Sequence, residues 1–272
     1  MQAFLKLFDF YIFANIHVAL ATFSLTKITL LSVGNQQNEV PFFVFFSTIV
    51  AYNFIRLYRK SDIKYWFSNW IEKNSIKIGL LSALSMVAIC YLALQLETKA
   101  ILSLVPFFIM TFFYVIPMGR MFPSNASLRT LAGIKIFIIA FCWAGVTVVF
   151  PLLNYDRMIS FDMLLVFVQR FLFVVAITLP FDLRDLSHDG DDLKTLPQLI
   201  GIAKSKKLGL LLLMLFLGLE FLINDVNQLR VTFIIALISL LFLIRSSTNQ
   251  NKYYSAFFVE GIPIVWLLLI LL

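Results

Sequence analysis

Five of the fifteen carboxylates in this chain lie within eleven residues, from Asp182 to Asp192. Asp182, Asp185 and Asp189 follow the spacing i, i+3, i+7, so a helix that continues through them would carry all three on one face. Carboxylates at this spacing repel one another unless a cation lies between them. With no cysteine nearby, oxygen ligands of this kind suit a hard cation, Mg²⁺ or Ca²⁺, more than Zn²⁺. Mg²⁺ commonly binds one or two carboxylates together with substrate phosphates. The spacing predicts a Mg²⁺ site at these three residues and a substrate with a phosphate or diphosphate; the alternative is a solvated acidic loop at a membrane surface.

A second run has the same spacing and the opposite charge. Asn53, Arg56 and Lys60 also follow i, i+3, i+7. A guanidinium meets phosphate oxygens in a planar fork, so this run is a candidate binding surface for the diphosphate. The alternative is that Arg56 and Lys60 are anchors whose charged ends extend to the membrane interface.

Four further basic residues are candidates for diphosphate binding. Arg129 lies at the end of a polar segment, and Lys135 follows it at ~8 Å along a helix axis. Arg184 and Lys194 lie within the acidic stretch itself. For Lys135 the alternative is a charge that only sets the topology.

The elements that must position these residues are membrane helices. The 272-residue chain is 61% hydrophobic and 14% charged, unlike a soluble globular domain. Apolar runs of about 20 residues, the length that a helix needs to cross the hydrocarbon, recur between short polar gaps. We predict an all-α, polytopic membrane protein in which a single domain, residues 1–272, forms a bundle of nine transmembrane helices. The predicted spans are residues 9–33, 40–57, 77–96, 99–117, 130–152, 159–180, 208–224, 229–245 and 253–272.

The distribution of lysine and arginine predicts the orientation. With the N-terminus in the cytoplasm, sixteen of the 22 basic residues fall in cytoplasmic segments and four in external ones, as the positive-inside rule requires. This orientation places the acidic stretch at the cytoplasmic side of a cell membrane, such as the bacterial inner membrane, and the C-terminus outside. The net charge of +7 then reflects topology, and nucleic-acid binding is not needed to explain it. A signal peptide that ends near Ala21 is the alternative for the first span.

Several ionisable residues lie inside the predicted spans. They include His17, Arg170, Glu220 and Glu260. Such residues usually face the bundle interior and mark function, although a packing role is the alternative for His17. We expect Arg170 to bind a partner within the bundle. A transporter is a further alternative for the whole chain, but these charges do not form a relay and the spans lack the broken pairs typical of that class.

One string of residues resembles a family motif. It reads Asp182-Leu183-Arg184-Asp185, then Asp189, then Thr195-Leu196-Pro197 and Gly201. Together with nine helices, an Asn at the end of the second helix and a basic segment between the fourth and fifth, it resembles the UbiA superfamily of intramembrane prenyltransferases. The helix count extends the resemblance along the chain, although outside the two motif regions it is only topological.

The resemblance implies a site and a reaction. Asp182, Asp185 and Asp189 would hold Mg²⁺ that carries the diphosphate of an isoprenoid donor. Asn53 would open the family's first motif and, with the three aspartates, would be a catalytic residue. Arg129 or Lys135 would contact the diphosphate. The isoprenoid group would pass to an aromatic or other lipid-soluble acceptor, in a cavity that opens toward the cytoplasm among membrane lipids.

The first motif departs from the family pattern. Acidic residues stand four and eight positions after its Asn in the family, and here these positions are Leu57 and Ser61. One interpretation is that Arg56, Arg59 or Lys60 replaces the charge of one missing metal ion in an atypical transferase. The other is that catalysis is lost, and the protein binds an isoprenoid or lipid diphosphate or acts as a structural partner in the membrane.

Overall fold

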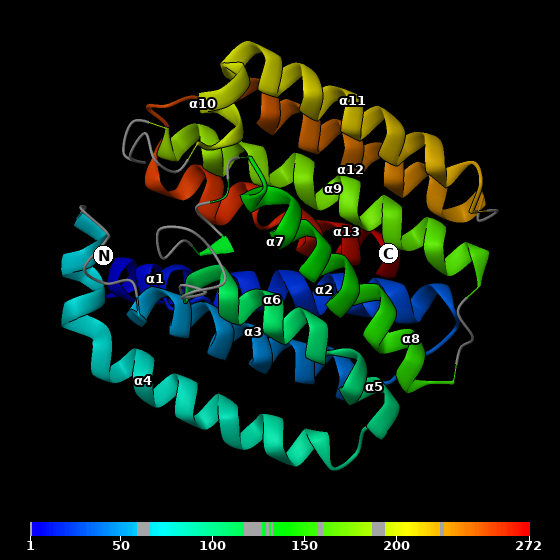
Figure 1. Cartoon of the computed structure of the whole chain (residues 1–272), viewed down its shortest axis with the longest axis horizontal. Helices are drawn as coiled ribbons and strands as arrows, with labels where there is room; N and C mark the ends of the chain where they lie inside the picture. Colours follow the sequence, from blue (N-terminus) through cyan, green and yellow to red (C-terminus); the bar gives the residue numbers. More distant parts are fainter. Residues whose placement is uncertain are drawn as a thin grey trace.

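The computed structural model describes residues 2–58, 66–116, 127–128, 131, 133–156, 160–186, 194–223 and 226–272. Within these residues the chain forms helices and no strand, which confirms the predicted all-α class. Most of the helices run side by side along the long axis of the molecule (Figure 1). Their order is α1 (Gln2–Phe13), α2 (Ile16–Ser32), α3 (Glu39–Tyr58), α4 (Trp66–Ala93), α5 (Thr98–Ser103), α6 (Val105–Val115), α7 (Lys135–Ala144), the π-helix η5 (Gly145–Val149), α8 (Phe150–Asn154), α9 (Phe161–Asp185), α10 (Leu196–Ile200), α11 (Ile202–Glu220), α12 (Val226–Arg245), the π-helix η7 (Tyr254–Val259) and α13 (Ile262–Leu271).

The largest apolar core lies around α9. Phe173 of α9 is fully buried, and its ring centre lies 5.3 Å from that of Phe216 on α11 and 5.1 Å from that of Trp266 on α13. α9 also packs against α7 and η7, while α2 packs against α3 and α13 (Figure 1). The helix that ends in the acidic stretch is therefore held from several sides.

The membrane spans agree largely with the prediction. Among the described residues, seven helices are long and apolar enough to cross a membrane, or eight when α1 and α2 count as one bent span. The remaining predicted span, residues 208–224, falls on α11, whose first turns carry three lysines. α11 still packs along α9 and α12 (Figure 1). The multi-pass arrangement is supported, and the count of nine spans stays a prediction.

The first span is not the continuous helix that was predicted. α1 and α2 meet at an angle of 54°, and Asn15 between them has a left-handed backbone conformation with φ of 67°. Asparagine adopts this conformation more readily than most residues. Apolar periodicity alone could not reveal the bend, because both arms are apolar.

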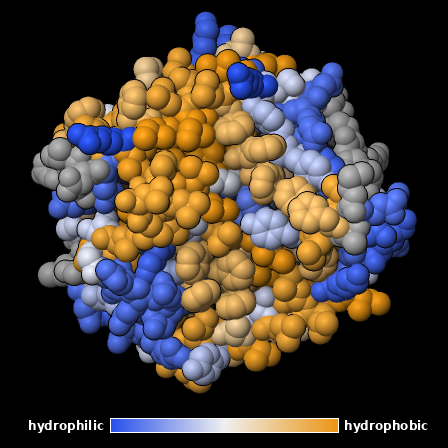
Figure 2. Space-filling model, turned by 180° about the vertical axis from the view of Figure 1, so that it is seen from behind, coloured by the Kyte–Doolittle hydropathy of each residue, from blue (hydrophilic) through white to orange (hydrophobic). Residues whose placement is uncertain are grey.

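The outer surface suits a lipid environment. On α4, large apolar side chains between 62% and 87% exposed recur every three to four residues; they are Ile76, Leu80, Leu84, Val87 and Tyr91. Figure 2 shows a broad apolar face on the other side of the molecule, with hydrophilic residues gathered toward its edges. An apolar surface of this extent is what a membrane-embedded bundle requires.

The charged groups inside the bundle have polar partners. Arg170 is 2% exposed, donates to the carbonyl of Leu25 at 2.8 Å and lies 5.3 Å from the ring centre of Trp266. The expected partner within the bundle is thus a backbone carbonyl and an aromatic face. Glu220 accepts a hydrogen bond of 2.5 Å from Gln169.

Polar contacts also join the first and last parts of the chain. Asp9 of α1 accepts hydrogen bonds from Lys252 at 3.0 Å and from Tyr253 at 2.6 Å. These contacts hold α1 against the segment that leads into η7.

Gly209 permits the close approach of three helices. A Cβ at this position would lie 2.5 Å from Leu243 Cδ2 and 2.8 Å from Leu179 Cδ1. Gly209→Val should therefore lower the free energy of unfolding by about 1–3 kcal/mol through overpacking. Unfolding by SDS titration, followed by circular dichroism, measures the loss. Gly218→Val on the same helix is the matched control, because nothing lies within 4 Å of its added Cβ; equal losses in both variants would contradict the packing role of Gly209.

Candidate functional site

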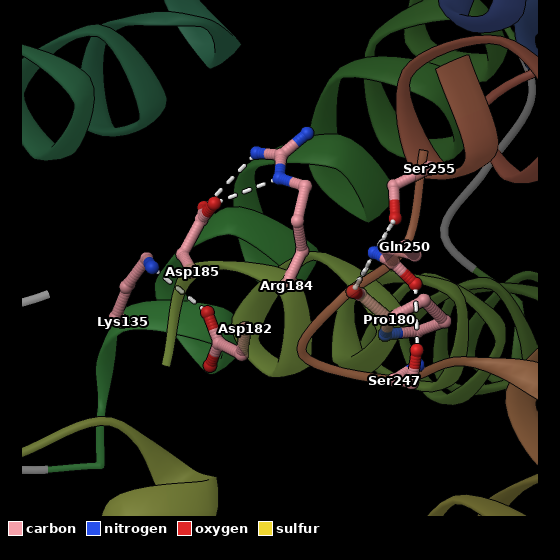
Figure 3. A network of polar contacts seen from close by, with 8 residues as sticks. All are labelled: Lys135, Pro180, Asp182, Arg184, Asp185, Ser247, Gln250 and Ser255. Carbon is pink, nitrogen blue, oxygen red and sulfur yellow. Dashed lines mark hydrogen bonds and ion pairs between the residues drawn. The ribbon is translucent and has the colours of Figure 1, made fainter. Parts of the chain in front are cut away.

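Lys135 and Asp182 form an ion pair at one end of the bundle. The Lys135 Nζ lies 2.8 Å from the Asp182 Oδ1, and the two side chains are 11% and 1% exposed (Figure 3). Lys135 is the first residue of α7, where the positive end of the helix dipole disfavours a cation. The buried carboxylate offsets this cost. The structure thus brings together two of the predicted site residues, which lie 47 residues apart in the sequence.

Asp185 is bound by the residue before it. The guanidinium of Arg184 makes two hydrogen bonds with the Asp185 carboxylate, at 2.7 and 3.0 Å. The same guanidinium lies 5.3 Å from the ring centre of Phe181. Both partners of this pair are about one third exposed, at 30% and 33%. The Asp182 side chain points toward Lys135, whereas the Asp185 carboxylate points toward the guanidinium of Arg184 (Figure 3).

The end of α9 is fixed by the segment before α13. The carbonyl of Pro180 accepts hydrogen bonds from Gln250 at 2.8 Å and from Ser255 at 3.3 Å (Figure 3). Gln250 also donates to the Ser255 hydroxyl at 2.6 Å. Because Pro180 is two residues before Asp182, these contacts fix the position of Asp182 relative to the segment before α13.

Asn53 supports the bend in the first span. It is fully buried, accepts a hydrogen bond of 2.6 Å from Asn15 and donates one of 3.2 Å to Ser82. Arg56, one turn further along α3, donates to the carbonyl of Phe13 at the end of α1, and its guanidinium lies 5.0 Å from the ring centre of Phe67. Both residues therefore satisfy backbone and side-chain groups at the break between α1 and α2, and their expected catalytic and binding roles stay predictions.

Charges from three elements meet near Arg56. The guanidinium of Arg56 interacts electrostatically with Arg184 of α9 and with the carboxylate of Glu260, which follows η7. Tyr52 lies within reach of the same charges, and its hydroxyl accepts a hydrogen bond of 2.9 Å from Trp143.

The segment after the acidic stretch has a defined structure. Thr195 caps α10, and its backbone N–H donates to the side chain of Gln198 at 2.7 Å, which completes a capping box. Gly201 ends α10 with φ of 84°, a conformation that favours glycine. The Thr-Leu-Pro…Gly string is therefore a short capped helix with a glycine stop. The carbonyl of Lys194, which is exposed, accepts a hydrogen bond of 2.9 Å from Gly133 and so joins this segment to the start of α7.

Three predicted site residues lie outside the described part of the chain. They are Asp189, Lys60 and Arg129. Within the described part, no group of three or more His, Cys, Asp or Glu side chains is close enough to hold a metal ion. Asp182 and Asp185 lie one turn apart and could supply two carboxylate ligands. Mg²⁺ commonly binds one or two carboxylates, with substrate phosphates among its other ligands. Their pairing with Lys135 and Arg184 fits an ion that arrives with a diphosphate better than an ion that is always bound.

The sequence alone did not assign Glu260 or Tyr52 to the site. Glu260 was notable only as a carboxylate inside a predicted span. Its approach to Arg56 depends on helix packing over two hundred residues of separation, so spacing could not reveal it. The position of an acid within the last apolar run was the available signal.

Comparison with known proteins places the fold. No protein-family model matches the sequence, and no curated protein sequence does. One solved structure, described as a digeranylgeranylglyceryl phosphate synthase in membranes, matches with a TM-score of 0.56 and 16% identity over 99% of this chain and 98% of its own. This chain shares the fold of that membrane synthase. The resemblance that the acidic motif indicated is therefore confirmed for the fold, along nearly the whole chain.

Proposed function

We propose that this protein is a membrane-embedded prenyltransferase that transfers an isoprenoid group from a polyprenyl diphosphate to a lipid-soluble acceptor. The observation that carries the proposal is the buried Lys135–Asp182 pair at the start of an Asp-x-x-Asp motif, within the UbiA fold. The solved structure with this fold is a synthase of a digeranylgeranylglyceryl phosphate. An isoprenoid donor and an aromatic or other apolar acceptor both dissolve in lipid, so they suit a site at the end of a lipid-exposed helix bundle.

Basic side chains would bind the diphosphate. Lys135 and Arg184 supply an ammonium and a guanidinium group beside the carboxylates of α9. Arg56, in the last turn of α3, would supply a second guanidinium group. A guanidinium binds phosphate oxygens in a fork, and an ammonium acts as a compact charge. Lys60, Arg129 and Lys194 are further candidates by their positions in sequence. These groups would stabilise the charge that develops on the leaving diphosphate.

Asp182 and Asp185, with Asp189, would hold Mg²⁺ that enters with the donor. The ion supplies charge neutralisation on the diphosphate. Lys135 and Arg184, now paired with these carboxylates, would then turn to the phosphate oxygens. The exchange keeps every buried charge compensated, both without and with the donor.

The membrane environment would serve the reaction. A water-poor site protects an allylic cation from hydrolysis and strengthens electrostatic contacts. We place the site at the cytoplasmic side of a cell membrane, because the basic residues of the chain favour that orientation.

One observation favours a second candidate function. Both described carboxylates of the motif are already paired with cations of the same chain, and Leu57 occupies a position that is acidic in the family's first motif. A protein of this kind would bind an isoprenoid or lipid diphosphate without turnover, or act as a structural membrane partner.

Transfer of a labelled isoprenoid distinguishes the two functions. The purified protein in lipid nanodiscs would receive labelled farnesyl or geranylgeranyl diphosphate, Mg²⁺ and a lipid extract as the source of acceptors. A transferase should convert label into a new lipid, with release of pyrophosphate, and Asp185→Asn should lose this product. Mass spectrometry of the extract identifies the acceptor. Binding of the donor by both proteins, without any product, would favour the non-catalytic function.

A further inference from the structure

The connecting segment between α12 and η7, residues 246–253, is held together by its own side chains. The backbone N–H of Ser247 donates to the Gln250 side chain at 3.4 Å (Figure 3). The backbone N–H of Tyr253 donates to the Asn251 side chain at 2.9 Å, a local turn that asparagine favours. The polar side chains of this segment are therefore presented from a short and internally bonded stretch of chain.

One side of the connecting segment holds the end of α9. The Gln250 Nε2 donates to the Pro180 carbonyl at 2.8 Å and to the Ser255 hydroxyl at 2.6 Å. The Ser255 hydroxyl, which is fully buried, donates to the same carbonyl at 3.3 Å (Figure 3). One glutamine amide thus joins the connecting segment, η7 and α9, two residues before Asp182.

The other side of the connecting segment holds the end of α1. The Lys252 Nζ donates to the Asp9 carboxylate at 3.0 Å and lies 5.4 Å from the ring centre of Phe13. The Tyr253 hydroxyl donates to the same carboxylate at 2.6 Å, and its ring stacks on that of Phe13 with the centres 6.2 Å apart. The carbonyl of Phe13 accepts a hydrogen bond from Arg56. The connecting segment therefore reaches the arginine of α3 through a single intervening residue.

Under the proposed function, on which this inference rests, Asp182 belongs to the acidic side of the diphosphate site and Arg56 to its basic side. We propose that Gln250 and Lys252 are positioning residues that set the separation between these two sides, Gln250 through α9 and Lys252 through α1. Functional groups must be held close to their productive geometry, and a misplacement of about 1 Å can lower a rate about a hundredfold. The connecting segment thus serves the site without a contact to the substrate.

Steady-state kinetics in lipid nanodiscs distinguish the two sides. The assay follows transfer from labelled geranylgeranyl diphosphate, with Mg²⁺ and a fixed amount of lipid extract. Gln250→Leu releases the end of α9 that carries Asp182, so kcat should fall about tenfold or more while KM for the donor changes little. Lys252→Met releases the end of α1 that orients Arg56, so KM should rise about three- to tenfold. Lys252→Arg can still bind Asp9 and should keep the wild-type KM.

Lys27→Met is the matched control. Lys27 also donates to backbone carbonyls, those of Gln36 and Gln37 in the connection between α2 and α3, and its substitution should leave kcat and KM unchanged. Thermal unfolding shows whether each variant is folded. If Gln250→Leu does not fold, Ser255→Ala tests the same side with a smaller change and should also lower kcat.

The outcomes separate this inference from the proposed function. A loss of stability with unchanged kcat and KM per folded molecule, while wild type turns over, overturns the inference and leaves the proposed function intact. A kinetic change confined to one side overturns the claim that the connecting segment sets the separation between both. Absence of turnover in wild type contradicts the proposed transferase, and the inference falls with it.

Discussion

Replacing Asp182 by alanine should abolish turnover and lower the free energy of unfolding by about 3–5 kcal/mol. The carboxylate is 1% exposed and lies 2.8 Å from the Lys135 ammonium. The substitution takes the Asp182 carboxylate away from the buried Lys135 ammonium. This cation lies at the start of a helix, where a positive charge is already unfavourable. SDS titration in mixed micelles measures stability, and the transfer assay measures turnover.

A charge-free pair separates the two effects. Lys135→Met combined with Asp182→Leu should recover most of the stability, since apolar residues of similar volume often replace a buried ion pair without loss. Turnover should remain absent, because neither the carboxylate nor the ammonium is restored. Turnover equal to wild type in the double variant would show that the pair is only structural.

Replacing Arg56 by alanine should weaken the binding of an isoprenoid diphosphate by about ten- to a hundredfold, the loss expected for one or two charge-assisted hydrogen bonds. Arg56→Lys should retain part of the affinity, because it keeps the charge and loses the planar fork. Calorimetry with Mg²⁺ titrated against each variant measures the effect. Since Arg56 also donates to the Phe13 carbonyl, the unfolding of each variant is measured in parallel.

Arg170→Met is the matched control for a buried arginine. Arg170 lies twelve residues before Asp182 on the same helix, ~18 Å along its axis, and binds Leu25 and Trp266. Arg170→Met should affect stability but not the affinity for diphosphate.

Leu57→Asp with Ser61→Asp, added to Arg56→Ala, should restore part of the affinity through a second metal ion. If Arg56→Ala binds as tightly as wild type, the basic face of α3 serves topology only.

The fold class could be predicted from the sequence, whereas the roles of the candidate site residues stay predictions. The apolar runs predicted a membrane bundle, and the acidic motif predicted the UbiA fold, because both depend on residues close together in the chain. Asp182 and Lys135 were each selected by type and position. Their direct pairing was not predictable, since it depends on how α7 packs against α9.

Two features required the packed structure. Asn53 was selected as a catalytic residue from its place at the end of a helix, and the structure adds a contact with Asn15 that only the bend of the first span creates. Glu260 follows η7, which packs on α9 and is held on its other side by the contact of His17 with the Phe257 carbonyl. Contacts of this kind join segments more than two hundred residues apart, so neither periodicity nor motif spacing contains them.

The π-helix η7 affects the direction in which the side chains after it point around the helix axis. A π turn holds about one residue more than an α turn, and each residue in an α-helix rotates the next by about 100°. The extra residue between Tyr254 and Val259 thus sets the direction in which Glu260 points. Deletion of a single residue in this turn would restore ordinary helix geometry and carry the carboxylate to a different face. The length of this turn, counted in single residues, therefore determines which face of the bundle Glu260 occupies.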